Sequence, residues 1–112
     1  MVTKKDIIEY IENLPEEFFR EKWNLGIKEV GEEMMVAEFG SFEGYMKENK
    51  NARLFFSTRR VGYDLYFIKR YKDIYENVSK DDFEKYYGKP AYRDIKEALE
   101  NQSKGPEAYI WL

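Results

Sequence analysis

The segment RLFFSTRRVGYDLYFIKRYK, residues 53 to 72, limits the possible folds of this chain more than any other stretch. Apolar residues both precede and follow Val61 and Gly62 in the sequence. A turn at Val61 and Gly62 would place Phe56 opposite Phe67. Both faces of such a hairpin are apolar at mid-strand, which suits the middle of a sheet that is covered on each side. We therefore expect residues 53–72 to form a β-hairpin at the centre of the fold.

Two further segments have the same alternating pattern. Apolar residues alternate with polar ones over residues 23–27, and the alternation returns over residues 34–39 after the turn sequence GEE. This period of two predicts a second hairpin over residues 23–39. The last five residues, AYIWL (108–112), are too apolar for a loose tail, so we expect them to add a C-terminal strand to the sheet.

Local capping signals predict helices before and between these strands. Thr3 and Asp6 have the spacing of a capping box, which predicts a helix from residue 4 to Pro15. Pro15, followed by two glutamates, suits the first turn of another short helix. Ser41 is a candidate N-cap for a weaker helix that contains Gly44.

The same kinds of signal predict two helices near the C-terminus. Ser79 and Asp82 repeat the capping box, and Gly88 stands where a left-handed residue would end the helix. Pro90 suits the start of a final helix, which Gly105 and the following proline would stop.

These elements together predict an α+β fold. Two hairpins and a C-terminal strand make an antiparallel sheet of about five strands, which the N-terminal and C-terminal helices would cover. The chain has 112 residues, a length typical of one domain, so we expect a single globular domain over residues 1–112.

The composition excludes much chemistry. The chain has no cysteine and no histidine, which removes disulfides, thiolate ligands, the commonest metal ligand and the usual acid–base catalyst. We therefore expect no catalytic activity, no cofactor and no metal. The sequence has no apolar run of the roughly 20 residues that a transmembrane helix needs, so we expect a cytoplasmic protein without membrane contact.

Charge is distributed unevenly along the chain. Residues 1–52 carry 7 basic and 12 acidic groups, residues 53–72 carry 6 and 1, and residues 73–112 carry 6 and 9, which sum to a net charge of −3. The candidate binding residues are the cations and two tyrosines of the basic segment: Arg53, Arg59, Arg60, Lys69, Arg70, Lys72, Tyr63 and Tyr66.

The basic segment has three interpretations. Charges at the ends of a hairpin discourage edge-to-edge pairing, and Arg59 would face Asp64 across the strands, so the cations could be purely structural. Cations interleaved with aromatic rings also suit single-stranded nucleic acid. The third interpretation is a contact for an acidic protein partner.

Size, composition and aromatic content favour a protein that acts by binding. We expect a small non-catalytic protein-binding module of the inhibitor, immunity or accessory type, with another protein as its partner. The alternative is a nucleic-acid-binding domain that uses the basic aromatic segment 53–72.

Overall fold

The computed structural model describes residues 1–110, and no β-strand occurs among them. The predicted α+β class, with its antiparallel sheet of about five strands, is therefore wrong. The elements are α1 (Lys4–Glu12), α2 (Glu16–Val30), α3 (Glu32–Phe39), α4 (Phe42–Asn77), α5 (Lys80–Tyr87), α6 (Lys89–Lys104) and the 3-10 helix η1 (Pro106–Tyr109).

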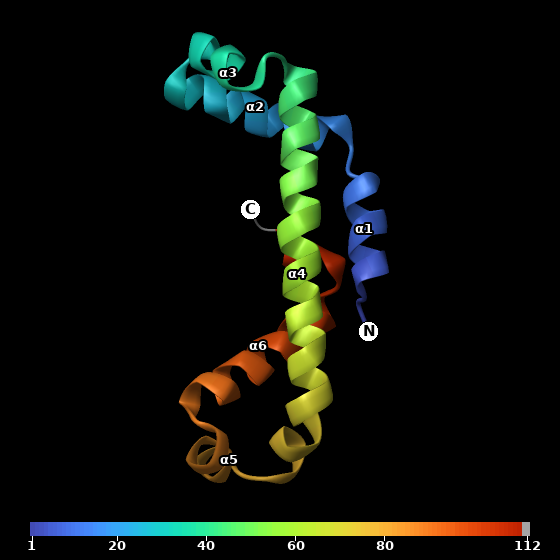
Figure 1. Cartoon of the computed structure of the whole chain (residues 1–112), viewed down its shortest axis with the longest axis vertical. Coiled ribbons are helices and arrows are strands. Elements are labelled where there is room, and N and C mark those ends of the chain that lie inside the picture. The colour runs from blue at the N-terminus through green and yellow to red at the C-terminus, as the bar shows by residue number, and fades with distance from the viewer. Residues whose placement is uncertain (111–112) are drawn as a thin grey trace.

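Helix α4 runs along the length of the molecule, and the other helices pack against it (Figure 1). It has 36 residues, and at 1.5 Å per residue it is about 54 Å long. Helices α2 and α3 pack at one end of α4, α1 and η1 pack along its middle, and α5 and α6 pack toward the other end. The molecule is accordingly elongated, with extents of 55 × 26 × 17 Å.

The predicted central hairpin, residues 53–72, lies entirely within α4. The residues that α4 buries in this segment are Arg53, Ser57, Val61, Asp64 and Ile68, which recur at intervals of four, four, three and four. This spacing places all five on one side of a helix. Because three of the five residues are polar, the positions of the apolar residues alone do not show the helical period.

The predicted hairpin over residues 23–39 is also wrong, because these residues complete α2 and form α3. Phe19, Trp23 and Ile27 are four residues apart and line one side of α2. Leu25, which the predicted strand would bury with Trp23 and Ile27, is 56% exposed. Gly31 separates the two helices with a φ of 91°, a left-handed conformation that glycine adopts without a steric penalty.

The C-terminal strand does not form over residues 108–110. Ala108 and Tyr109 belong to η1, which follows Gly105 at a φ of 93°. The other two residues of the predicted strand, Trp111 and Leu112, lie outside the described residues.

The predicted helix starts are confirmed. Asp6 N–H donates to the Thr3 hydroxyl at 3.3 Å, and Thr3 N–H donates to the Asp6 carboxylate at 2.9 Å, which completes the capping box of α1. Ser41 accepts from Gly44 N–H at 3.1 Å. At the start of α5 the Ser79 hydroxyl accepts from Asp82 N–H at 3.1 Å, which is one of the two hydrogen bonds of the predicted capping box.

Three small apolar clusters lie along α4 in place of one large core. The first joins α1, η1 and the middle of α4, the second joins α2, α3 and the start of α4, and the third joins α5, α6 and the later part of α4. Their buried members are Val2, Ile7, Ile11, Val61 and Tyr109; Phe19, Trp23, Met35 and Phe42; and Ile68, Phe83, Ile95 and Ala98.

None of the helices within residues 1–110 combines the length and the apolar character that a membrane-spanning helix needs.

Candidate functional site

The eight predicted binding residues all belong to helix α4, but they lie on different sides of it. Arg59, Tyr63, Tyr66, Lys69 and Arg70 are all exposed and share one side of the helix, because residues three and four apart are neighbours on a helical surface. The other three, which are Arg53, Arg60 and Lys72, are held in contacts with the protein itself.

Arg53 is buried and joins α4 to the C-terminal segment. It is 1% exposed, its Nε donates to Asn49 Oδ1 at 2.6 Å, and one of its terminal nitrogens donates to the Ile110 carbonyl at 3.1 Å. Its guanidinium also lies 4.8 Å from the centre of the Phe18 ring in α2. Burial lowers the pKa of Arg53 from its usual value. In this position Arg53 organises the fold rather than meeting an external partner.

Arg60 and Lys72 form ion pairs on α4. Arg60 Nε lies 3.4 Å from Asp64 Oδ1, and its Nη2 lies 3.3 Å from a Glu97 carboxylate oxygen in α6. The prediction that Arg59 would face Asp64 across two strands is therefore wrong, since the helix pairs Asp64 with the residue four positions before it. Lys72 lies 3.9 Å from Glu76, an exposed pair of small energetic weight.

A buried polar network fixes the side of α4 opposite the exposed residues. Ser57 Oγ donates to the Tyr109 carbonyl at 2.6 Å, and Asp64 Oδ2 accepts from Asn101 at 3.2 Å. Gln102 donates to the Tyr109 hydroxyl at 3.2 Å. Burial, with a contribution from Asp64, raises the pKa of Tyr109 well above its usual value. The network holds α6 and η1 against this side and leaves the other side of α4 uncovered.

That uncovered side is an aromatic and basic strip, which we call the α4 face. Residues 55 and 70 lie about 22 Å apart along the helix axis. Its four aromatic side chains are 52–55% exposed, and Asp64, the one acidic residue between 53 and 72, is buried beneath it. The members of the α4 face are Phe55, Phe56, Arg59, Tyr63, Tyr66, Lys69 and Arg70.

The side chains of the α4 face contact one another. The Arg59 guanidinium lies 5.2 Å from the centre of the Phe55 ring, a cation–π distance. Arg70 donates to the Tyr71 hydroxyl at 3.2 Å and to the Tyr66 hydroxyl at 3.5 Å, and the bond to Tyr71 is the main reason that the pKa of Arg70 is raised. Tyr66, Lys69 and Arg70 also line a shallow hollow.

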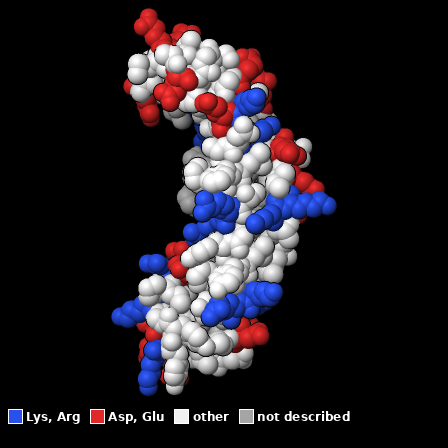
Figure 2. Space-filling view, viewed as in Figure 1, with Lys and Arg blue, Asp and Glu red and all other residues white. Residues whose placement is uncertain are grey.

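The cations of this face are available to a partner. Within residues 1–110, Arg59, Lys69 and Arg70 take part in no ion pair. Figure 2 shows basic side chains along the part of the molecule where α4 faces the viewer, whereas acidic side chains gather at the α2–α3 end. The molecule is thus polarised even though its net charge is only −3.

The prediction from sequence omitted two members of the site. Phe55 and Phe56 lie within the predicted hairpin and are not among the eight predicted binding residues, but they are 54% and 52% exposed on the α4 face. Their helical spacing from Arg59 and Tyr63, at intervals of three and four, is the signal that could have found them.

The described residues include no group of three or more acidic side chains placed to hold a metal ion. Comparisons of the chain with protein-family models, with curated proteins and with solved structures found no match. The functional argument therefore rests on the geometry of the α4 face.

Proposed function

We propose that this protein is a small non-catalytic binding module and that the α4 face docks a protein partner. The observation that carries this proposal is the strip of four half-exposed aromatic rings and three cations on one uncovered helix side, and these cations form no ion pair with any residue from 1 to 110. Phe, Tyr and Arg are the residue types enriched at protein interfaces, and Tyr and Arg are frequent among the residues that dominate binding energy.

The shape of the strip favours a protein over a single-stranded nucleic acid. Side chains at intervals of three and four on a convex helix present the ridges into which a second helix packs. Proteins that bind single strands usually track the phosphates along a basic groove. The overall charge of −3, with 12 acidic groups in residues 1–52, also opposes a polyanion.

The charge of the α4 face defines the chemistry of its partner. Arg59, Lys69 and Arg70 would meet carboxylates at the rim of the contact, while the aromatic rings would pack on apolar side chains at its centre. The rim charges speed association and select an acidic surface, and the rings supply most of the affinity.

Photocrosslinking from the α4 face tests this function. Benzoylphenylalanine replaces Tyr63, which is 54% exposed on the face, or Tyr86, which is 74% exposed on α5. We expect crosslinking in extract of the source cells to yield a discrete protein adduct from position 63 that position 86 does not give. Replacing both Arg59 and Arg70 with alanine should reduce this adduct severalfold, because the rim charges would be lost.

Nuclease treatment and salt titration separate the protein from the nucleic-acid alternative. An adduct that nuclease removes, together with oligonucleotide binding whose salt dependence flattens in Arg59→Ala, would assign the face to nucleic acid. Equal adducts from positions 63 and 86 would remove the basis of the proposal.

A further inference from the structure

We infer that the occupant of the α4 face is a second copy of this chain, which docks by an acidic hollow beside α1. This inference rests on the proposed function, since it names the partner of the same face. The two surfaces differ in charge and lie on opposite sides of the molecule, so the association would run head to tail.

The acceptor is a hollow whose lining has both carboxylates and apolar residues. We call it the α1 hollow, and it lies between α1, the link to α2, and the start of η1, with a volume of about 450 Å³, in the range of binding clefts. Its lining residues are Asp6, Glu9, Tyr10, Asn13, Leu14, Pro15 and Pro106.

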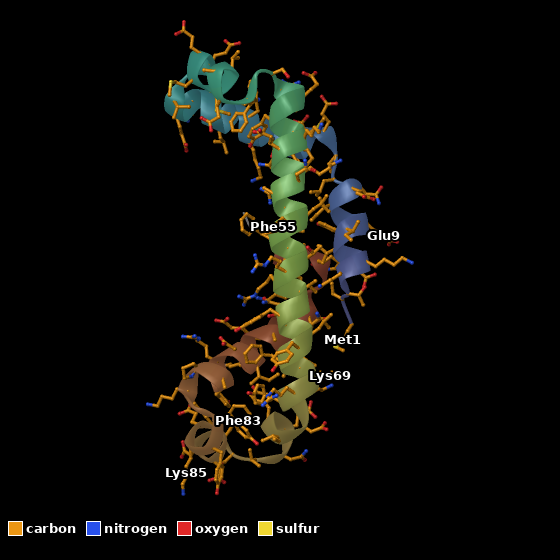
Figure 3. The ribbon with its side chains drawn as sticks, viewed as in Figure 1. Met1, Glu9, Phe55, Lys69, Phe83 and Lys85 are labelled. Carbon is orange, nitrogen blue, oxygen red and sulfur yellow. The ribbon has the colours of Figure 1, made fainter. Side chains whose placement is uncertain are left out.

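The α1 hollow is negatively charged. The Asp6 carboxylate accepts from Thr3 N–H at 2.9 Å, and hydrogen bonding to Thr3 lowers the pKa of the Asp6 carboxyl. Glu9 is exposed and points away from α4 on the outer side of α1 (Figure 3). Together they supply two carboxylates to a lining that also contains the apolar residues Leu14 and Pro15.

The α4 face has the complementary chemistry. Phe55 and Arg59 form an exposed pair in which the guanidinium lies 5.2 Å from the ring centre. A phenyl ring suits the apolar lining residues of the α1 hollow, and a guanidinium beside it suits the two carboxylates of that lining. Tyr10, 37% exposed at the edge of the α1 hollow, offers a further aromatic contact.

The two surfaces cannot meet within one molecule. Val61 packs on Ile7 and Ile11 of α1, whereas Tyr63 lies two residues further along α4, about 200° around the helix. Figure 3 accordingly shows Phe55 and Glu9 on opposite sides of α4.

The positions of the α4 face and the α1 hollow on opposite sides of the chain also determine the symmetry of the association. A contact between two different patches is heterologous, and it continues into a chain or closes into a ring. The competing symmetric arrangement, with the α4 faces of two copies together, would bring Arg59, Lys69 and Arg70 of both copies into one contact without an exposed acid from either strip. Like charges in one interface disfavour that dimer.

Sedimentation velocity of the purified full chain tests the inference. From micromolar to near-millimolar protein, we expect the average mass to rise beyond that of a dimer. The double variant F55A/R59A should weaken self-association about tenfold or more, since it removes one aromatic anchor and one cation. The double variant E9A/Y10A should do the same from the other surface, and it leaves the cap residue Asp6 intact.

Mixing the two variants distinguishes head-to-tail contact from a symmetric one. The F55A/R59A chain keeps an intact α1 hollow and the E9A/Y10A chain keeps an intact α4 face, so together they should form a 1:1 complex that grows no further. The control K85A/Y86A removes an equivalent cation–aromatic pair from α5, where Lys85 lies 5.9 Å from the Tyr86 ring, and should associate like the original chain.

Three results would overturn the inference: a monomer at every concentration, self-association that E9A/Y10A leaves unchanged, or no 1:1 complex in the mixture. Each variant is checked for unchanged helical circular dichroism before use. A monomeric chain that still gives a position-63 adduct with a different protein would refute self-association alone and leave the proposed function standing.

Discussion

At the scale of single residues, the polar side chains under α4 determine which side of the helix is covered. Burying a polar or charged side chain is costly unless its hydrogen-bonding groups are satisfied. Arg53 meets this condition through Asn49 and the Ile110 carbonyl, and Ser57 meets it through the Tyr109 carbonyl. These bonds tie the C-terminal segment to one side of α4, and the aromatic residues on the other side remain exposed as a consequence.

The contribution of Arg53 can be measured with an alanine substitution. Arg53→Ala should lower the free energy of unfolding by about 2 to 3 kcal/mol, because the partly buried Ile110 carbonyl and the Asn49 amide lose a charged donor. Lys72→Ala is the control, and it should cost about 0.5 kcal/mol or less, since its pair with Glu76 is exposed. Urea denaturation compares the two, and equal midpoints would show that Arg53 has no such role.

At the scale of elements, local signals predicted the helix starts and long-range pairing was predicted wrongly. A cap such as Thr3 with Asp6 is decided within one turn, so it can be found in the sequence. The hairpin over residues 53–72 failed because α4 buries Arg53 and Asp64 and exposes Phe55, which is the reverse of what hydrophobic patterning assumes.

The candidate site was predicted in part for the same reason. The basic segment was found from its charge, which needs no knowledge of the fold. Its division into an exposed group with Arg59 and a buried or paired group with Arg53 and Arg60 depends on the helical period of α4. A predicted strand has a side-chain period of two, so it could not separate the exposed cations from the buried or paired ones.

Two glycines within α4 should respond oppositely to alanine. A Cβ at Gly62 would lie 2.7 Å from Cε of Lys4, the far end of a flexible side chain that can move, so Gly62→Ala should stabilise by about 0.5 to 1 kcal/mol through helix propensity. A Cβ at Gly44 would meet the backbone carbonyl of Phe39, which cannot move without disturbing the α3–α4 turn. Gly44→Ala should therefore destabilise by about 1 kcal/mol or more.

Thermal unfolding followed by circular dichroism measures both glycine variants. The midpoint should rise for Gly62→Ala and fall for Gly44→Ala. A fall at both positions would mean that the Lys4 side chain is held in place over Gly62.

At the scale of the whole molecule, three separate apolar clusters share one long helix. The second cluster, around Phe19, involves α2, α3 and the start of α4, and the third, around Phe83, involves α5, α6 and the later part of α4. In Figure 1 α2 and α3 lie at one end of α4 and α5 lies at the other, and α1, which contributes to the first cluster, lies between them. Such an arrangement allows the ends to open independently, since few contacts other than those of α4 connect them.

Matched core substitutions at the two ends test this independence. Phe19 and Phe83 are each 1% exposed, and replacing either with alanine removes about 3 to 5 kcal/mol from its own cluster. We expect Phe83→Ala to accelerate amide hydrogen exchange in α5 and α6 while α2 and α3 exchange as before, and Phe19→Ala to give the reverse pattern. Mass spectrometry of peptides from both ends measures the rates. A uniform acceleration at both ends in either variant would mean that α4 transmits the loss and that the chain unfolds as one cooperative unit.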